Sequence, residues 1–457
     1  MLWQKTACEV IDLLHNREIS GHDLVDSVEA RIKQVDGSIN ALPTLCFDRA
    51  REQLAQSESR PYSERGPLYG LPVTIKDLTA VQGVRTTSGS KLYQDFVPAQ
   101  SDQLVRKIEN SGGLVFAKSN TPEFGTGGIT FNDVFGLTRT PRNTGFASGG
   151  SSGGAAASLA SGCAWLSHGS DMAGSLRTPA GFCGVTSLRP CAGRIRSDSE
   201  YLPYSVLGAE GPMARNIADL GLFADAMFAQ PGASLSAAAT TPVTPRHVAF
   251  STDLGITSID DDVAEVFTAF IDSLRRVGIE AVDAAPNLSG VHGAFDVLRA
   301  HEYAISLEQT LNNYPGVMKP EVQWNIEQGL ALSADDLRQA KRTQGRIIND
   351  AARFMDDFDL LICPATSVSS VNAELRYPGS DGDVAIPEYY RWLGIAYATT
   401  MTSLPIITLP CGVTKSGMPV GVQLVGKLWG EEKLLQYARA IEAMVDWDSS
   451  PIDPINP

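Results

Sequence analysis

The sequence predicts an α/β protein, and two observations carry this prediction. Short apolar runs that are typical of buried strands alternate along the chain with segments of helical periodicity. The predicted strands are residues 73–75, 114–120, 163–167, 247–253, 358–366 and 403–413. No boundary separates two independent patterns, so we expect residues 1–457 to form one large domain.

The expected helices lie between these runs. Residues 4–35 have helical spacing, and Ser20 with Asp23 gives a capping-box pattern inside them. Further helices are predicted at residues 155–161, 261–277, most of 290–355 and 431–444. Residues 230–246 are rich in Pro, Ala and Thr, and they are the best candidate for a linker or surface loop.

Composition excludes several classes of partner. Of the 457 residues, 43% are hydrophobic and 19% are charged, which is typical of an ordinary globular protein. The net charge of −15 argues against a nucleic-acid partner and against an anionic membrane surface. No apolar run approaches the roughly 20 residues that a membrane span requires.

The seven cysteines are scattered, and none lies at metal-ligand spacing from another cysteine or a histidine. This usage indicates reduced thiols. The first twenty residues carry charges where a signal peptide needs an apolar run. We therefore expect a cytoplasmic protein without a metal, and the oligomeric state, a homodimer included, stays open.

The stretch GGSSGG, residues 149–154, leads directly into the Ala-rich segment. Its backbone N–H groups at a helix N-terminus could hold negative charge, and a flexible turn explains the same pattern. A P-loop is excluded because no Lys-Ser or Lys-Thr follows at the required offset. The stretch also matches G-x-S-x-G, which would make Ser152 a nucleophile, but no downstream histidine has the context that this motif requires.

A second stretch, GSDMAGSLRTPAGFCG at 169–184, combines four glycines with two serines, an acid and an arginine. A turn needs fewer glycines, so this pattern indicates backbone arranged around a reacting atom. A serine hydroxyl becomes a good nucleophile only when a base takes its proton. Lys76 follows a buried run and can be that base if burial lowers its pKa, although a surface lysine at a strand end fits Lys76 taken alone.

Together these pieces closely resemble the amidase signature family of serine hydrolases. The resemblance covers GLPVTIKD at 70–77, KSNTPEFG at 118–125, FGLTRTPRN at 135–143, SGGSSGGAAA at 148–157, GSDMAGSLRTPAGFCGVTSLRP at 169–190 and SLPIITLPCGVTKSGMPVGVQLVG at 403–426. It implies a central mixed β-sheet flanked by helices on both faces. Residues 230–355 are the least similar part, and we expect them to form a mostly helical region on the substrate side.

By this resemblance, Lys76, Ser151 and Ser175 occupy the positions of the family's Ser–Ser–Lys triad. Ser175 would be the nucleophile, Ser151 the bridging serine on a cis peptide, and Lys76 the neutral base. The oxyanion hole would be formed by the backbone N–H groups of Met172, Ala173, Gly174 and Ser175. The reaction would need no metal and no cofactor.

The resemblance also suggests supporting residues. Ser152 would support the contact between Lys76 and Ser151, and Asp171 and Arg177 would pair with each other to hold the loop. Three further residues align with a stretch that lines the pocket in relatives, namely Phe124, Gly125 and Thr126.

The implied activity is an amidase that cleaves the C–N bond of a small-molecule linear amide through a seryl acyl-enzyme. The alternatives are a member of an amidotransferase complex, a non-catalytic partner that keeps the fold, and an esterase or carbamate hydrolase. Met172 and Ala173 depart from the family's usual Thr-Asp-x-Gly-Gly-Ser and could reshape the acyl side of the site. Residues 207–215 lack the Asp-Gln-x-Gly-Pro pattern associated with the glutaminase component of tRNA-dependent amidotransferases, which argues against that role.

Overall fold

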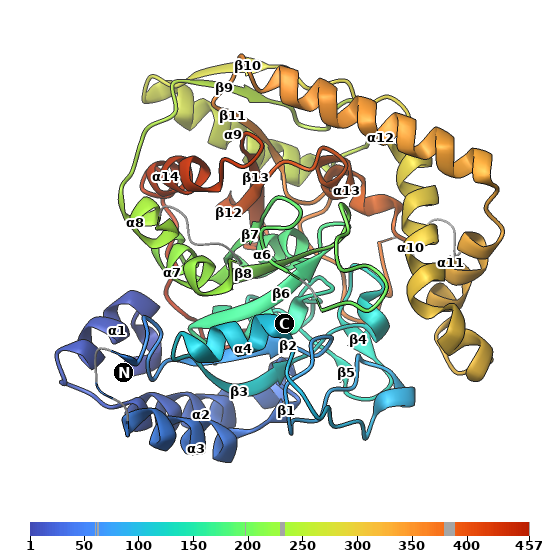
Figure 1. The fold of residues 1–457 in the computed structure, drawn as a ribbon. Helices are drawn as coiled ribbons and strands as arrows, with labels where there is room; N and C mark the ends of the chain where they lie inside the picture. The colour runs from blue at the N-terminus through green and yellow to red at the C-terminus, as the bar shows by residue number, and fades with distance from the viewer. Residues whose placement is uncertain (60, 62–63, 197, 229–233, 379–388, 457) are drawn as a thin grey trace.

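The computed structural model describes residues 1–59, 61, 64–196, 198–228, 234–378 and 389–456. Within them, eleven strands form one mixed sheet that draws on both halves of the chain (Figure 1). In order across the sheet the strands are β1 (Thr44–Leu45), β3 (Leu114–Ser119), β2 (Pro72–Lys76), β6 (Leu166–Asp171), β8 (Ala209–Ala214), β7 (Thr186–Arg189), β12 (Ile406–Val413), β13 (Pro419–Val425), β11 (Leu360–Pro364), β9 (His247–Phe250) and β10 (Glu280–Asp283).

Strand β2 pairs in parallel with β3 and β6, and β9 pairs in parallel with β11 and β10. The other pairings in this sheet are antiparallel. Strands β2, β3 and β11 are buried along their whole length, which explains why they appear in the sequence as continuous apolar runs. The predicted α/β class with a central mixed sheet is therefore confirmed.

Helices flank this sheet (Figure 1). They are α1 (Ala7–His15), α2 (Gly21–Ile39), α3 (Phe47–Glu58), α4 (Gln103–Asn110), α5 (Gly153–Ala160), α6 (Arg177–Cys183), α7 (Ile217–Met227), α8 (Leu235–Thr240), α9 (Asp261–Arg276), α10 (Val291–Asn313), α11 (Pro320–Leu330), α12 (Ala334–Phe354), α13 (Gly394–Thr400) and α14 (Glu431–Glu442). A short 3-10 helix, η4 (Glu123–Gly125), and a small hairpin of β4 (Phe131–Asn132) and β5 (Gly136–Leu137) lie outside the sheet.

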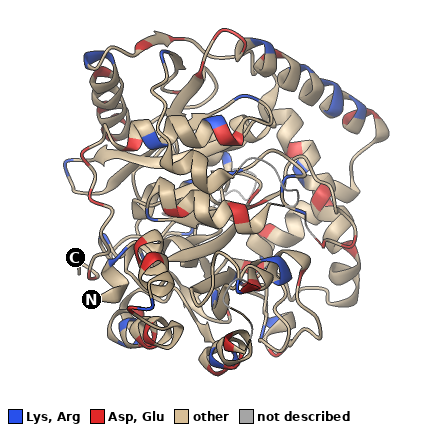
Figure 2. Ribbon diagram, turned by 60° about the vertical axis from the view of Figure 1, so that its left-hand side comes forward, with Lys and Arg blue, Asp and Glu red and all other residues tan. Residues whose placement is uncertain are grey.

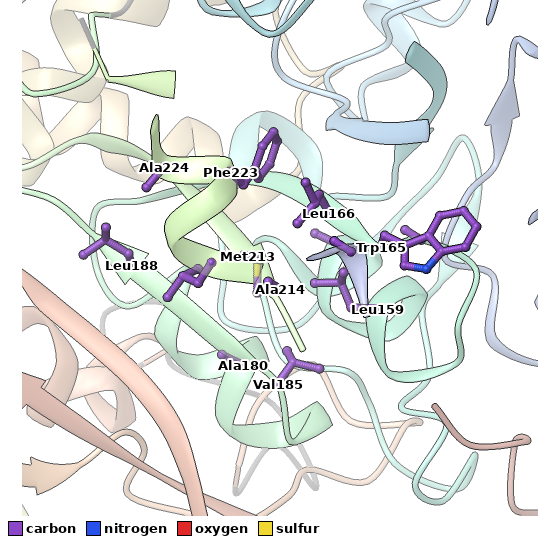
Figure 3. Close-up of a cluster of buried hydrophobic side chains, with 14 of the residues drawn as sticks. Leu159, Trp165, Leu166, Ala180, Val185, Leu188, Met213, Ala214, Phe223 and Ala224 are labelled. Atoms are coloured by element: carbon purple, nitrogen blue, oxygen red, sulfur yellow. The ribbon is translucent and has the colours of Figure 1, made fainter. Parts of the chain in front are cut away.

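One apolar cluster fixes the centre of the molecule (Figure 3). Its members come from helices and strands alike, and five that are fully buried are Leu159 in α5, Ala180 in α6, Leu188 in β7, Met213 in β8 and Phe223 in α7. Burying a side chain of this size contributes roughly 1.5–3 kcal/mol. Helices α5 and α6 therefore rest on the same core, and this fixes the loops at their N-terminal ends.

The structure corrects two expected boundaries. The predicted helix at 4–35 is broken into α1 and α2, with Arg17 in a left-handed conformation between them. Ser20 and Asp23 form the predicted capping box of α2. The strand predicted at 163–167 begins only at Leu166, because the N–H of Cys163 still bonds to the end of α5, and it continues to Asp171.

The predicted loop at 230–246 contains a helix, α8, in its described part. The Asp225 carboxylate accepts hydrogen bonds from the N–H groups of Leu235 and Ser236, and Leu235 and Ala238 are buried. The hydrogen bonds from Asp225 stabilise the first turn of a helix that the Pro-rich composition of this segment did not predict. Residues 230–233 lie outside the described part of the chain.

Basic and acidic residues lie side by side on the outer helices (Figure 2). On α12, for example, Arg346 and Arg353 both pair with Asp350. Among the residues that the structure describes, no helix has the length and apolar character needed to cross a membrane.

Candidate active site

Lys76 is the last residue of β2, at the carboxyl end of a strand that lies between two parallel neighbours. Ligands of parallel α/β sheets commonly bind at this edge. The Lys76 side chain has no solvent exposure. The apolar run that precedes it is buried in the sheet, so the strand delivers an amine into the protein interior.

The Lys76 ammonium contacts hydroxyl groups rather than a carboxylate. Nζ lies 2.7 Å from Ser151 Oγ, 2.9 Å from Ser152 Oγ and 3.0 Å from Ser170 Oγ. Burial lowers the pKa of Lys76 to about 7, and the attraction of the Glu210 and Asp171 charges opposes this shift without cancelling it. A substantial fraction of Lys76 is therefore a neutral amine near pH 7, which can accept a proton from Ser151.

Ser151 and Ser152 precede α5, and the Gly150–Ser151 peptide bond is cis, as the resemblance implied. The glycines around them are required by packing. A Cβ on Gly150 would lie 2.9 Å from the Ile129 backbone, and one on Gly154 would overlap the Asn120 backbone nitrogen. Close approach of three backbone segments therefore accounts for the glycine-rich sequence.

Three N–H groups at the N-terminus of α5 already donate to protein acceptors. The N–H of Ser152 donates to the Ser175 carbonyl, that of Gly153 to Thr130 Oγ1, and that of Gly154 to the Asn120 carbonyl. These three N–H groups are therefore not available to hold the negative charge that the sequence suggested for GGSSGG. The first of these bonds instead ties the Ser151–Ser152 segment to the loop that carries Ser175.

Ser175 lies in the loop between β6 and α6 and is half-buried. Its side chain lines the same cavity as Ser151. Among the described residues, the N–H groups of Met172, Ala173 and Ser175 donate to no protein acceptor, whereas the N–H of Gly174 already donates to Asp171 Oδ1 at 2.9 Å. Of the four predicted oxyanion donors, Gly174 is therefore occupied and the other three are available.

The predicted pair of Asp171 and Arg177 is present and buried. Arg177 donates to Asp171 from Nε at 3.0 Å and from Nη2 at 2.7 Å. Burial alone would raise the pKa of Asp171, but the Arg177 charge and its hydrogen bonds, with help from Arg189, hold this pKa well below its usual range. Arg177 also donates to Thr399 and Gln423, so the pair anchors the Ser175 loop to α13 and β13.

A cavity of about 420 Å³ opens beside Ser151 and Ser175. Its walls come from η4, from the loop between β7 and β8, and from α10 on the right of Figure 1. Its described lining contains no Lys or Arg side chain. The residues that line it include Phe124, Gly125, Glu210, Glu302, Tyr303 and Ser306.

Two of the three predicted pocket residues line this cavity, namely Phe124 and Gly125. A Cβ on Gly125 would lie 3.5 Å from Ser151 Oγ, so this glycine lies directly at the site. Thr126 does not line the cavity. Its side chain is buried and its hydroxyl bonds to Tyr303 at 2.8 Å, so Thr126 supports a wall residue instead.

Two features of the site were not predicted from the sequence: Ser170, which contacts Lys76, and the pair of the buried His168 with the partly exposed Glu210. The alternation of a strand could have found them, since His168 and Ser170 share one face of β6. His168 bonds to Glu210, and within the described residues no histidine bonds to Ser152. The esterase alternative that uses Ser152 therefore finds no partner histidine in the described part of the chain.

The sequence matches the amidase family over residues 23–435. The chain belongs to this family. It is 32% identical to a glutamyl-tRNA(Gln) amidotransferase subunit from a Synechococcus strain, over 95% of this chain and 96% of the relative. It is 30% identical to the acylamidase of Rhodococcus erythropolis, over 98% of each chain.

Solved structures show the same fold. A bacterial aryl acylamidase of the amidase signature family superposes with a TM-score of 0.88 at 21% identity, over 97% of each chain. A crystal structure of an amidase gives a TM-score of 0.85 at 26% identity, over 96% of this chain and 100% of that one. In the described residues of this family member, no cluster of three His, Cys, Asp or Glu side chains could hold a metal.

Proposed function

We propose that this protein is an amide hydrolase that cleaves the C–N bond of a small-molecule amide through an acyl-enzyme on Ser175. The observation that carries the proposal is the buried Lys76 amine, which lies 2.7 Å from Ser151, and Ser151 lines the same cavity as Ser175. A nucleophile, a proton relay and a base that is partly neutral at pH 7 are the groups that acyl transfer requires.

In the first step, Lys76 accepts the proton of Ser151 while Ser151 accepts that of Ser175. The Ser175 Oγ forms a bond to the amide carbonyl carbon, and the carbonyl oxygen becomes an oxyanion. The N–H groups of Met172, Ala173 and Ser175 stabilise this charge. Loss of one such donor costs roughly 3–4 kcal/mol in other hydrolases.

In the second step, the tetrahedral intermediate collapses and the C–N bond breaks. Ser151 gives its proton to the leaving amine and takes one from Lys76, which returns to the neutral state. Water then loses a proton through the same relay and attacks the Ser175 ester, and the carboxylic acid leaves. Carbamates and esters can follow the same course, because only the leaving group differs.

The second candidate is a glutamine-hydrolysing component of an amidotransferase, which the 32% identity to such proteins favours. The cavity favours the first candidate, because no Lys or Arg side chain is in its described lining. The α-carboxylate of glutamine would be desolvated there without a cationic partner, which is costly. A non-catalytic partner role would leave the Lys76–Ser151 contact unexplained.

The test measures product release from matched primary amides, anilides, carbamates and esters, with glutamine and ammonia release as a further arm. Wild type is compared with Ser175→Ala in the presence of a metal chelator. We expect hydrolysis of at least one amide class by wild type and a loss of about 10³-fold or more in Ser175→Ala. Equal turnover by the two proteins would overturn the assignment of Ser175, and turnover of glutamine alone would favour the amidotransferase role.

A further inference from the structure

A pair formed by a buried histidine and a partly exposed carboxylate lies beside the proposed base. His168 in β6 has no solvent exposure, and its Nε2 lies 2.7 Å from Glu210 Oε2 in the adjacent strand β8. The other ring nitrogen, Nδ1, accepts the backbone N–H of Lys76 at 3.4 Å. An acceptor at Nδ1 places the ring proton of neutral His168 on Nε2, which then donates to Glu210.

The register of β6 and β8 places the pair of His168 and Glu210 next to the candidate active site. Ser170 in β6 lies opposite Glu210 in β8, and the Ser170 hydroxyl contacts Lys76 Nζ. Glu210 also lines the cavity with Ser151 and Ser175, and its side chain is 22% exposed there. One carboxylate thus touches the cavity and, through His168, reaches the backbone of the lysine.

We propose that Glu210, together with His168, is a positioning residue that orients the end of β2 and sets the pH at which Ser175 becomes reactive. This inference rests on the proposed function and adds a part to it. Among the described residues, the side-chain contacts of Lys76 Nζ are hydroxyls and not carboxylates. The negative charge of Glu210 acts on Lys76 from β8, which is separated from β2 by β6. Burial lowers the pKa of Lys76, and Glu210 is the strongest of the charges that raise it again.

Other charged groups surround Glu210 on the elements packed against it. Asp171 pairs with both Arg177 and Arg189, so these three groups together carry a positive charge, and Glu302 faces the same cavity from α10. Burial raises the pKa of Asp102, at the start of α4, and the Glu210 and Asp198 charges raise it further. None of these groups replaces the contact of Glu210 with His168.

The charge of Glu210 determines in which direction its removal changes the pKa of Lys76. Removal of the Glu210 charge leaves the protonated form of Lys76 less favourable, so Lys76 becomes neutral at a lower pH. Ser175 should then keep its reactivity further into the acid range. A purely structural role for Glu210 would lower reactivity at every pH without moving the midpoint.

The experiment measures the rate at which a fluorophosphonate labels Ser175 between pH 5 and 9, with intact-mass detection and Ser175→Ala as the labelling control. No substrate is needed. We expect Glu210→Gln, which keeps an acceptor for His168, to move the midpoint down by about 0.5 pH unit or more, which makes labelling about threefold faster on the acid side. Glu210→Ala should shift it in the same direction, and Glu210→Asp should restore the wild-type midpoint.

The matched control is Glu280→Gln. Glu280 lies 3.8 Å from His247 at the far edge of the same sheet, in an exposed pair. This variant should label as wild type does. Unshifted midpoints in Glu210→Gln and Glu210→Ala would overturn the inference while leaving the proposed function intact. A wild type that no probe labels at any pH would instead overturn the proposed function itself.

Discussion

At the scale of single residues, Lys76 combines two properties that oppose each other. It is fully buried, which disfavours its charged form, and it contacts three hydroxyls that can accept from an ammonium. Burial dominates and lowers the pKa to about 7 from the ordinary value of 10.5. The same burial that lowers the pKa of Lys76 therefore makes the folded state less stable whenever this lysine is protonated.

The pH dependence of stability tests this conclusion. Between pH 7 and 10.5, Lys76 is protonated in the unfolded chain and neutral in the folded chain. The free energy of unfolding therefore rises with pH in this window. We expect the stability of wild type to rise relative to Lys76→Met by up to about 1.4 kcal/mol per pH unit there. Urea unfolding at pH 7 and pH 9 measures the difference.

The same variant should lose fluorophosphonate labelling of Ser175 while it stays folded. Stability curves of wild type and Lys76→Met that run parallel between pH 7 and 9 would contradict a lowered lysine pKa. Retained labelling in Lys76→Met would contradict its role as the base.

At the scale of elements, helix α5 shows how the site is built by close packing. All its residues are buried, and most are Gly or Ala. Its N-terminal end fits between the loops that carry Asn120 and Thr130. Small residues are needed there because the backbones approach within a few ångströms, and no glycine flexibility is required at Gly153 or Gly154, which are helical.

Two glycine-to-alanine variants separate packing from helix propensity. In Gly154→Ala the new Cβ would overlap the Asn120 nitrogen and lie 2.5 Å from the Ala41 carbonyl oxygen, both of them rigid backbone atoms. We expect a loss of about 1–3 kcal/mol or more from this overpacking. Gly345→Ala in α12 meets nothing within 4 Å and should gain about 0.5–1 kcal/mol.

Thermal and urea unfolding of both variants against wild type check these values. A neutral Gly154→Ala would show that α5 can shift, and it would remove the packing explanation for the GGSSGG sequence.

At the scale of the whole molecule, the cavity exists because three distant segments meet. Phe124 comes from η4, Glu210 from β8 and Ser306 from α10. Ser306 belongs to the region that we expected to be least similar to the family, and we propose that it affects substrate choice although it lies far in sequence from the serines. Relatives with different activities can therefore share one fold.

A bulky residue on α10 tests the role of this wall. Ser306→Trp should fill part of the cavity and raise KM for anilides at least tenfold, because a bulky acyl or aryl group no longer fits. It should leave kcat for small primary amides within about twofold, since the serines and Lys76 are untouched. Ser306→Ala is the control, because it does not enlarge the side chain. Steady-state kinetics of both variants on both substrate classes give the comparison.

Much of this architecture could be predicted from the sequence because it is local. A buried strand such as β2 requires a continuous apolar run, and the capping box of Ser20 and Asp23 acts within one turn. The motifs around Ser151 and Ser175 likewise identify the candidate serines without any contact information. The break between α1 and α2 and the start of α8 escaped prediction, because a left-handed residue and a distant carboxylate, Asp225, decide them.

The fold class and the positions of most strands and helices follow from the amino-acid sequence, and its motifs name candidate reactive residues through their resemblance to the amidase signature family. Which of these residues meet follows only from the packed chain. The strand order places Lys76 between β3 and β6. The register of β6 and β8 brings Glu210 beside Ser170 and His168. The Asp171 carboxylate accepts the N–H of Gly174. The physical reason is that the hydrophobic pattern of a segment depends on which of its own faces is buried. The charge state of a buried amine depends instead on every segment packed around it.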